Sequence, residues 1–476
     1  MLRGSHRILP VAVVFLALLP LTSAPPRRVV YLPFSDAKPI LENLSEILPP
    51  PLHGADSNSL AKLWPAWVKK RDAEIRERLS RGDEDTVVNF LFFGTSFTKQ
   101  PRITAAQIRA LAAEAEAGEQ GTTSVREIFS ERTADLVRGM TAPGHNERLR
   151  FCRGVAERAG VHFSSENVFT KGRMYLVENV LRVLKEQSSF QQALAAARAL
   201  DPTEEFAERS KLYKERGLSL DTSLLPDYAL EVALRKMRDR GLLARDSIHR
   251  VGIIGPGLDF TDKQEGYDFY PPQTVQPFAV ADSLLRLGLA MPGHLDVATL
   301  DLSARINEHI ERAQRAAAAG RGYTIQLPRD AAAGWEPAAV AYWKRFGDQI
   351  GSPVQPVTVP AALKETTVRA VRVRPDMVRR LKAFDVNIVL QREDLPSEKK
   401  FDLLIATNIF VYYDTFEQSL ALANVGAMLR PGGFLLTNNL LLELPSLKMK
   451  GSDYVSVPYS AREAHGDRIL WYRRQP

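Results

Sequence analysis

The chain has 476 residues, 45% of them apolar and 25% charged, so it is long enough for one large hydrophobic core or two to three ordinary ones. Its formal net charge of +7 is spread along the chain without a polybasic block, so nucleic-acid binding is not indicated. Cys152 is the single cysteine, which excludes an intrachain disulfide and a thiolate metal cluster, and the eight scattered histidines form no HExxH pair, so no metal site is expected.

The first residues have the three parts of a secretory signal. Arg3 and Arg7 precede an apolar run over 8–21, and small residues follow at 22–24. The run is short for a membrane span, and a proline and two arginines behind it disturb both cleavage and orientation. We expect residues 1–24 to be a signal-like segment that directs export or membrane association; an uncleaved anchor and a misassigned start codon are the alternatives.

Residues 60–241 have mainly helical periodicity, with apolar residues three and four apart in stretches such as GRMYLVENVLRVLKEQSSFQQALAAARAL. This pattern predicts a helical accessory domain that follows a linker over 25–59. Within it, VVNFLFFGTSFTKQPRIT (87–104) breaks the rhythm with a Gly-Thr-Ser turn. A turn that caps a buried segment explains this break more simply than a ligand loop does.

Residues 242–476 follow another pattern, in which short apolar runs alternate with helical stretches. The runs HRVGIIG, LDVATLD, FDVNIVL, FDLLIATN and GGFLLTNN read as strands, and 303–319 reads as a helix. Such alternation predicts an α/β fold with a parallel sheet that is covered by helices on both sides. Ligands of such sheets bind outside the carboxyl ends of the strands, so the loops after the strands are the places to search.

One helix has clear sequence signals at both ends. Residues 415–418 (TFEQ) read as a capping box, and the run RPGG at 430–433 ends the helix before a strand that begins at Phe434. These signals predict local structure only, and the function must come from neighbouring residues.

The stretch VGIIGPGLDF (251–260) has the appearance of a nucleotide loop after a strand. A nicotinamide cofactor requires a third glycine and a helix that begins at once, so that the helix can direct its amino end at a diphosphate. Phe260 stands where that glycine is required, and the residues behind it contain two prolines and no helical period. A nicotinamide oxidoreductase is therefore disfavoured.

A ligand without a diphosphate, such as S-adenosylmethionine, needs glycines after the first strand and carboxylates after later ones. Gly255 and Gly257 provide the close backbone approach. Asp301 ends the run LDVATLD and is placed to accept both ribose hydroxyls, Asp394 to accept from the adenine amine, and Asn408 to face the reacting methyl end. Each has a simpler alternative, since Asp301 would also cap the helix after residue 303 and Asp394 would also be an ordinary loop acid.

The run FDLLIATNIFVYYDTFEQSLALANVGAMLRPGGFLLTNN resembles the class I S-adenosylmethionine-dependent methyltransferases, in particular the chemotaxis-receptor glutamate methyltransferases of the CheR type. Those proteins carry a phrase like FDLIxCRNVLIYF, then a helix and LxPGGxL. Further matches upstream extend the resemblance over 246–474, about half the chain, with 408–438 as its most specific part. The resemblance implies a seven-stranded Rossmann-like methyltransferase sheet with an antiparallel last strand, to which the final two strand patterns fit.

By position, the resemblance carries the cofactor loop to Gly255 and Gly257 and the ribose acid to Asp301. It carries the residues beside the methionine moiety and the acceptor to Asn408 and Tyr412. Asp259 stands where many methyltransferases have another glycine, so it either reaches the amino group of the cofactor or holds the turn.

The sequence also departs from the family pattern. Asp394 falls where the family has asparagine, so the adenine contact is altered. Gln276 replaces a glutamate and Thr407 replaces an arginine, which leaves the identity of the acceptor open.

The acceptor side is expected to consist of aromatic and polar side chains, although ordinary packing is an equal explanation for the aromatic ones. These candidates for substrate binding are Tyr267, Tyr270, Gln276 and Tyr413, with Tyr412 and Asn408 as the catalytic candidates. A sulfonium methyl is already electrophilic, so positioning and loss of the acceptor proton supply most of the acceleration. No residue stands out in the sequence as a general base.

The sequence therefore predicts an S-adenosylmethionine-dependent methyltransferase domain over 242–476 that acts on an oxygen, nitrogen or carboxylate acceptor, either a small molecule or a protein. The alternative is a catalytically inactive binding protein of the cell envelope with the same fold. Its support is the signal-like segment, because the methyl donor is made in the cytosol. Localisation is left open between export and a cytoplasm-facing position.

Overall fold

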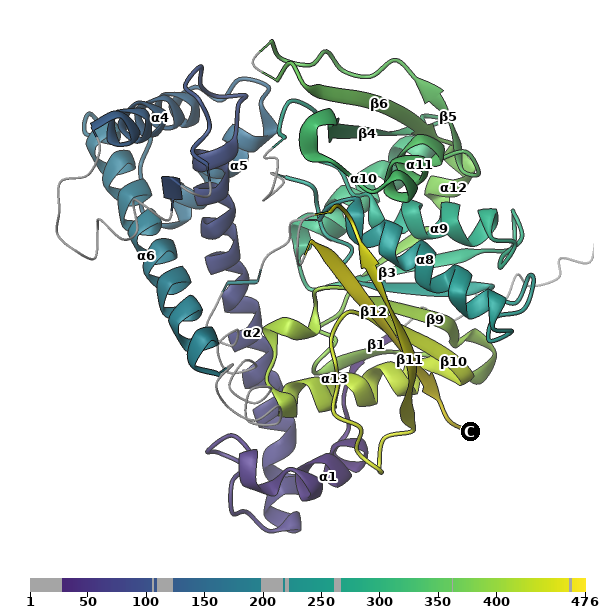
Figure 1. The fold of residues 1–476 in the computed structure, drawn as a ribbon. Helices are drawn as coiled ribbons and strands as arrows, with labels where there is room; N and C mark the ends of the chain where they lie inside the picture. The colour runs from purple at the N-terminus through teal and green to yellow at the C-terminus, as the bar shows by residue number, and fades with distance from the viewer. Residues whose placement is uncertain are drawn as a thin grey trace, which may run out of the picture.

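A computed structural model describes residues 28–104, 107–108, 123–197, 217–218, 222–260, 267–361, 363–461 and 465–476 of the chain. Its centre is a seven-stranded sheet in the order β11-β12-β10-β9-β2-β3-β7 (Figure 1). Neighbouring strands pair in parallel except for β12, which runs antiparallel to both β10 and β11. The α/β fold class, with a seven-stranded Rossmann-like sheet and an antiparallel last strand, is confirmed. The strands are β2 (Arg250–Ile254), β3 (Asp296–Asp301), β7 (Leu381–Asp385), β9 (Phe401–Ala406), β10 (Leu429–Thr437), β11 (Met449–Pro458) and β12 (Gly466–Arg474).

Helices cover both faces of this sheet because alternate strand residues point to opposite sides. Val251 and Ile253 of β2 share a core with α8 (Leu225–Asp239), α9 (Gln276–Arg286) and α10 (Ala304–Ala318). Ile254 shares a second core with α13 (Thr415–Met428), α1 (Phe34–Asn43) and the first half of α2 (Ser57–Phe93). The sheet is thus the middle of a three-layer unit, as the buried parallel strands require.

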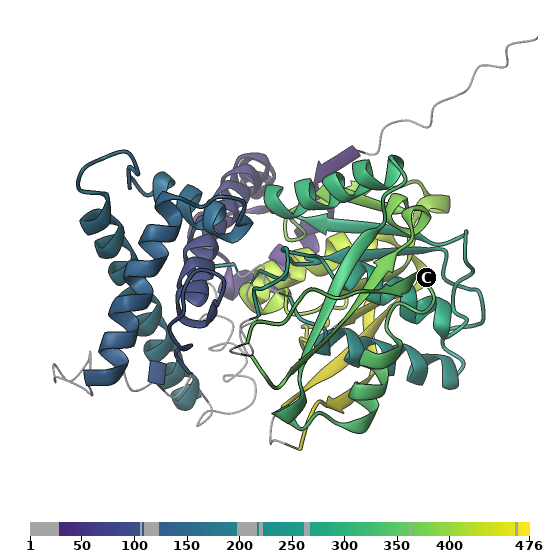
Figure 2. The ribbon, with the colours of Figure 1, turned by 90° about the horizontal axis from the view of Figure 1, so that it is seen from above.

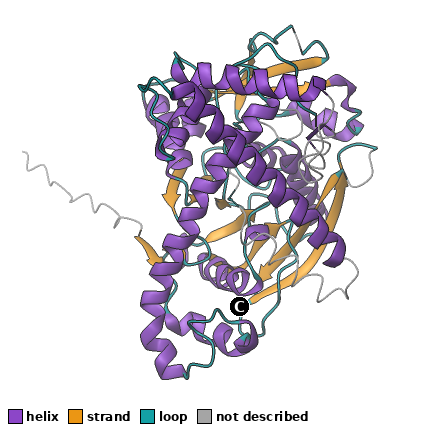
Figure 3. Ribbon diagram, turned by 90° about the vertical axis from the view of Figure 1, so that its left-hand side faces the viewer, coloured by secondary structure: helices purple, strands orange, loops and turns teal. Residues whose placement is uncertain are grey.

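The accessory region is a separate layer of helices beside the sheet (Figures 2 and 3). It consists of the second half of α2 with α4 (Thr123–Thr141), α5 (Glu147–Arg158) and α6 (Val168–Ala197), around a third core. Phe260, the residue in place of the third glycine, is buried in that core, and its ring packs against Phe90 and Phe151. The glycine loop of the sheet is thereby attached to the helical region.

The Gly-Thr-Ser turn after α2 serves the same junction. The backbone N–H groups of Thr95 and Ser96 donate to the buried carboxylate of Asp268 at 2.9 and 2.7 Å. The segment is therefore a turn that satisfies a buried acid, as its composition favoured.

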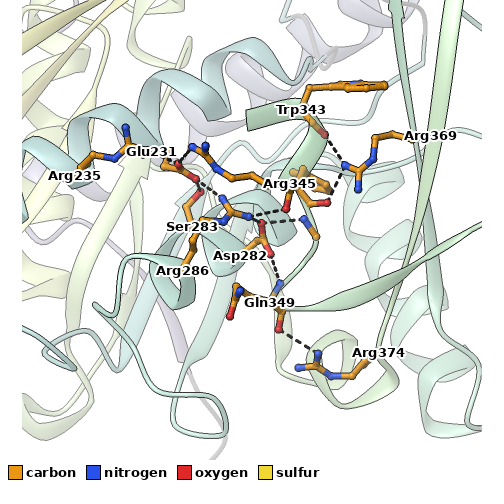
Figure 4. Close-up of polar contacts among 12 residues, drawn as sticks. Glu231, Arg235, Asp282, Ser283, Arg286, Trp343, Arg345, Gln349, Arg369 and Arg374 are labelled. Atoms are coloured by element: carbon orange, nitrogen blue, oxygen red, sulfur yellow. Dashed lines mark hydrogen bonds and ion pairs between the residues drawn. The ribbon is translucent and has the colours of Figure 1, made fainter. Parts of the chain in front are cut away.

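A second, three-stranded antiparallel sheet is inserted between α10 and β7. It has the order β4-β6-β5, with β4 (Tyr323–Asp330), β5 (Gly351–Val354) and β6 (Thr366–Val373), and it is accompanied by α11 (Pro337–Arg345) and α12 (Pro375–Arg379). A buried ion cluster joins this insertion to the main sheet: Glu231 of α8 binds Arg286 of α9 and Arg345 of α11, both at 2.5 Å (Figure 4). Asp282 of α9 accepts from the backbone N–H of Gln349 at 2.9 Å, beside the start of β5.

Two segments were expected in the first 60 residues, a signal-like segment and a linker. The proposed signal-like segment 1–24 lies outside the described residues. The stretch expected as a linker over 25–59 contains β1 (Arg28–Tyr31) and α1, which buries Ala37, Ile40 and Leu41 and contacts α13. Among the helices of the described residues, none has both the length and the apolar character that crossing a membrane requires.

The boundary between the accessory region and the sheet unit was expected at residue 242, but the sheet unit begins earlier in the chain. Helix α8 precedes that boundary, yet its Ala229, Leu230 and Leu234 lie in the same core as α9 and β3. Its apolar face is therefore covered by the sheet unit and not by the accessory helices.

The run FDVNIVL is a strand only at its beginning. β7 ends at Asp385, and Asn387 then forms a turn in which its side chain accepts from Val389 N at 3.2 Å and donates to Asp72 at 2.8 Å. Asparagine favours such turns, and the apolar residues around it are buried against helices without joining a ladder.

The capping box of α13 also lies one residue earlier than expected. Asp414 is the N-cap and accepts from Glu417 N at 2.9 Å, while the Glu417 side chain accepts from Asp414 N. Aspartate is the stronger cap, so it takes the place expected of Thr415.

Candidate functional site

A cavity of about 510 Å³ opens at the carboxyl ends of β2, β3 and β9. From β2 the chain proceeds to β3 and β7 on one side, and then returns to β9 on the other side of β2. The cavity therefore lies at the point where the strand order reverses, which is where open α/β sheets bind their ligands. Helix α2 of the accessory region adds Leu79 to its wall.

The glycine loop after β2 forms the floor of the cavity. Gly255 and Gly257 both line it and have φ values of 64° and 72°, a conformation that other residues rarely adopt. A Cβ atom at Gly255 would lie 2.1 Å from the Ile409 side chain, so the position has no room for one. Among the described residues, the next helix after the loop is α9, which begins at Gln276.

Asp301, at the end of β3, lies beside this loop in the cavity wall and is 5% exposed. Burial raises the pKa of its carboxyl to about 7. One carboxylate oxygen accepts from Ser303 N at 2.7 Å, so the residue holds the turn that leads into α10, whose N-cap is Ser303 itself. Its carboxyl still lines the cavity, and hydroxyl donors there would stabilise the ionised form.

An apolar wall adjoins Asp301 and was not predicted. Leu302 after β3, with Val386 and Ile388 after β7, lines the cavity at this end. The run FDVNIVL contains Val386 and Ile388, but the whole run was expected to be a strand. No loop was therefore predicted after Asp385.

Asn408 and the segment behind it form the wall after β9. Asn408 has a φ of 58°, which asparagine tolerates better than most residues, and its backbone N–H donates to the Asn438 side chain at 2.8 Å. Tyr412 and Tyr413 follow in the same wall. Arg78 of α2 donates to the Tyr412 carbonyl at 2.8 Å, so the accessory region holds this loop in place.

The two departures from the family pattern contact each other in the wall. The Gln276 side-chain amide donates to Thr407 Oγ1 at 2.9 Å. Asp227 of α8 lies beside Gln276 and is 2% exposed, and burial raises the pKa of its carboxyl to about 8. Neither carboxylate oxygen of Asp227 has a partner in good hydrogen-bonding geometry among the described residues, and the nearby Gln276 side chain offsets the effect of burial on the pKa only in part. No sequence signal marked this acid, because it belongs to an ordinary helical pattern.

The hairpin of β11 and β12 closes the side opposite the apolar wall. Tyr459, His465 and Asp467 line the cavity there, and the Tyr459 hydroxyl donates to Asp467 at 2.6 Å. His465 Nδ1 lies 2.6 Å from the hydroxyl of Ser460. The sequence predicted two strands here and gave no indication of a functional role.

Three of the predicted residues line a smaller neighbouring cavity of about 50 Å³ and not the main one. These are Asp259, Tyr267 and Tyr270. Asp259 accepts from the Tyr270 hydroxyl at 2.8 Å and from Gln273 at 2.9 Å, so its carboxylate holds the loop together. The two cavities share wall residues at 222, 223 and 225, so they lie next to each other.

Asp394, unlike the other predicted cofactor residues, lines neither of the two cavities. It is exposed at the end of β8 (Gln391–Asp394) and is not among the residues that line the cavity. β8 pairs with β1, opposite Arg28, and does not join the seven-stranded sheet. Its end therefore does not open onto the same edge as Asp301 and Asn408.

The charged side chains in the wall of the main cavity are mainly acidic. Its described lining contains Asp301, Asp467 and His465, and no lysine or arginine. Among the described residues, no group of histidine, cysteine and acidic side chains could hold a metal ion. The cavity is therefore suited to a neutral or cationic ligand.

Comparisons with known proteins give remote similarities only. No protein-family model and no curated protein matches the sequence. Among solved structures, the chain is similar to the mitomycin 7-O-methyltransferase MmcR, at 10% identity over 78% of this chain and 94% of that one, with a TM-score of 0.30.

Two further structures are similar at the same level. One is the CMeT domain of the citrinin polyketide synthase, at 12% identity over 93% of this chain and 98% of that one, with a TM-score of 0.27. The other is the magnesium protoporphyrin IX methyltransferase ChlM from Synechocystis PCC 6803 with bound SAM, at 10% identity over 58% and 85%, with a TM-score of 0.24. Such TM-scores carry no argument about this chain, whose fold class rests on its own strand order.

Proposed function

We propose that the chain is an S-adenosylmethionine-dependent methyltransferase. The observation that carries this proposal is the joint position of the tight loop at Gly255 and Gly257 and the buried acid Asp301, on neighbouring strands around one cavity. This is the pair that a nucleoside without a diphosphate requires, a close backbone approach and an acceptor for two ribose hydroxyls. The resemblance of 408–438 to the CheR-type methyltransferases supports the same function from another part of the chain.

The residues of the cavity fit the three parts of this methyl donor. Leu302, Val386 and Ile388 are suited to the adenine ring, whose faces are apolar. Asp301 is suited to the ribose, and the loop at 255–257 with Asn408 to the methionine part. In this arrangement the adenine contact proposed for Asp394 passes to the loop after β7.

The acceptor end of the cavity then lies on the side of Tyr412, Gln276 and the β11–β12 hairpin. The bound donor supplies an electrophilic methyl group, and the chain has to position an acceptor in line with it. Tyr412 and Tyr413 are proposed to pack against that acceptor, and the small cavity with Tyr267 and Tyr270 extends the space for it.

The alternative, an inactive binding protein with the same fold, makes a different prediction for ligand binding. The enzyme accounts for a left-handed glycine loop and a buried acid side by side at one open cavity, because its methyl donor requires both. The signal-like segment 1–24 remains a proposal for export or membrane association, and the finding that favours the enzyme is the intact cavity.

Titration calorimetry with S-adenosylmethionine tests the proposal. We expect the wild type to bind, and Asp301→Ala to bind at least roughly 30-fold more weakly, because charge-assisted hydrogen bonds to the ribose are lost. Asp394→Ala is the matched control, since this acid is exposed outside the cavity. Absence of binding to the wild type would refute the function, and equal loss in both variants would refute the ribose assignment.

A further inference from the structure

The described residues of β12 and of the segment before it reach past the edge of the sheet at the acceptor end of the cavity. β12 is antiparallel to β10, and Leu470 pairs with Thr437, the last residue of β10. The residues before Leu470 therefore extend beyond the carboxyl edge of the sheet, and His465 lines the cavity there. The sheet order places β12 on the far side of β9 from β3 and its Asp301.

The imidazole of His465 is held by its surroundings. Nδ1 lies 2.6 Å from Ser460 Oγ, and the ring meets that of Tyr459 edge to face at 5.6 Å between centroids. The backbone is fixed as well, because Tyr459 N donates to the His465 carbonyl at 2.9 Å and Glu336 N donates to the Tyr459 carbonyl at 2.8 Å. When Nδ1–H donates to Ser460, Nε2 keeps a free lone pair and is a base.

The charge of the cavity restricts the acceptor that this base would serve. A carboxylate acceptor would bring a further negative charge beside Asp301 and Asp467, where the described lining has no lysine or arginine. A carboxylate also needs no base, because it has no proton to lose near neutral pH. A hydroxyl or amine acceptor adds no negative charge to the cavity, and it has a proton that a base can accept.

We propose that the acceptor is a hydroxyl- or amine-bearing group and that His465 Nε2 accepts its proton during methyl transfer. This inference rests on the proposed function and narrows its acceptor class. The acceptor lone pair forms the new bond to the methyl carbon while the electron pair of the C–S bond goes to sulfur, and the acceptor proton passes to Nε2. Ser460 is a positioning residue that selects the tautomer. The product is a neutral ether or amine, and the imidazolium later loses its proton to water.

Titratable and polar groups from two elements lie around His465. On its own hairpin these are Tyr459, which is hydrogen-bonded to Asp467, and Ser460. From α8, Asp227 acts on the same Tyr459 ring and raises the pKa of that hydroxyl together with burial and Asp467.

The test uses the full chain labelled with ¹⁵N in its histidines, and it needs no knowledge of the acceptor. The ring signals of His465 are assigned with His465→Gln and followed over pH in complexes with S-adenosylmethionine and with S-adenosylhomocysteine. We expect Nδ1 to carry the proton of the neutral ring. We also expect the titration midpoint to lie about one pH unit lower in the S-adenosylmethionine complex, because only that ligand has a sulfonium charge.

His294 is the matched control, since it is exposed just before β3, at the opposite edge of the sheet. Its midpoint should not differ between the two complexes. Equal midpoints for His465, or an Nε2–H tautomer, would overturn the proposal. If neither ligand binds, the proposed function fails instead, so the two failures are distinguishable.

The acceptor class is tested on protein saturated with S-adenosylhomocysteine. Phenol, benzylamine and benzoate are added at equal concentration as probes of similar size and different charge. We expect phenol and benzylamine to shift the His465 signal and benzoate to leave it unchanged, with His294 unmoved by all three. A response to benzoate as large as that to phenol, or no response to any probe, would count against the proposed acceptor class.

Discussion

Helix α8 contains two buried acids one turn apart, and the two have opposite surroundings. Glu231 is 0% exposed and is bound by Arg235, Arg286 and Arg345 at 2.5 to 2.7 Å, in the ion cluster of Figure 4. Asp227 is equally buried and has no hydrogen-bond partner for either oxygen among the described residues. Glu231 is therefore paired with arginine side chains, and Asp227 has no such pair among the described residues.

The difference follows from what each end of α8 packs against. Glu231 faces α9 and α11, which supply arginines and join the inserted sheet to the main one. Asp227 lies in the first turn, next to Leu225 and Pro226, which line the cavity. A buried acid with its arginines is explained by the fold, whereas a buried acid without them at a cavity is expected to serve a ligand.

The largest effect is expected from breaking the ion cluster. Glu231→Gln removes the charge that Arg286 and Arg345 share, so we expect the free energy of unfolding to fall by about 3–5 kcal/mol, as for other buried ion pairs that lose one partner. Urea denaturation followed by circular dichroism measures this loss. Glu311→Gln is the control, because Glu311 and its partner Arg315 are exposed, and it should cost at most about 0.5 kcal/mol. Equal losses in both variants would remove the basis for the comparison.

The second prediction concerns Asp227 and has the opposite sign. Its pKa of about 8 in the folded protein exceeds the unfolded value of about 3.9, so between these pH values the folded state keeps a proton that the unfolded state has lost. This contribution to stability is complete below about pH 4, falls by up to about 1.4 kcal/mol per pH unit, and is lost by about pH 8.

Asp227→Asn has no such proton, so its stability relative to the wild type should rise between pH 5 and pH 8. The difference between the two unfolding midpoints at these pH values measures the effect, and the comparison with wild type cancels the other titrating groups. A difference that does not change with pH would mean that Asp227 is ionised in the folded protein.

The sequence predicted those features of the fold and of the candidate site that leave a local pattern. The alternation of short apolar runs and helical stretches predicted the sheet, because burial on both faces leaves a local mark on each strand. Gly255, Gly257 and Asp301 were predicted in the same way, since each lies at or just after the end of such a run, and parallel strands bring all three to one cavity. The loss of Asp394 from this set has a non-local cause, the pairing of β8 with β1 from the start of the chain.

Asp227 and His465 could not be found from the sequence, for the same physical reason. Neither stands in a motif. His465 reaches the cavity, and Asp227 comes to lie behind the cavity wall beside Gln276, through packing between segments far apart in the chain. These contacts are the hairpin against residues 335–336 and α8 against α9. Burial and the absence of a countercharge are properties of the folded chain, and no local pattern of residues records them.

The smallest expected effect tests whether Asp227 serves the ligand as well as its own helix. Asp227 lies beside Gln276, which lines the cavity, so a cation in the cavity favours its ionised form. S-adenosylmethionine and S-adenosylhomocysteine differ by one methyl group and one positive charge, so the ratio of their affinities reports that electrostatic coupling. We expect Asp227→Asn to lower the preference for S-adenosylmethionine about three- to five-fold, equivalent to about 0.7–1 kcal/mol, by titration calorimetry at pH 8. Glu231 is shielded by its arginines and should leave the ratio unchanged when it is replaced by glutamine. If both variants keep the wild-type ratio, the unpartnered acid acts on the stability of the fold alone, and the contrast between the two ends of α8 has no bearing on the ligand.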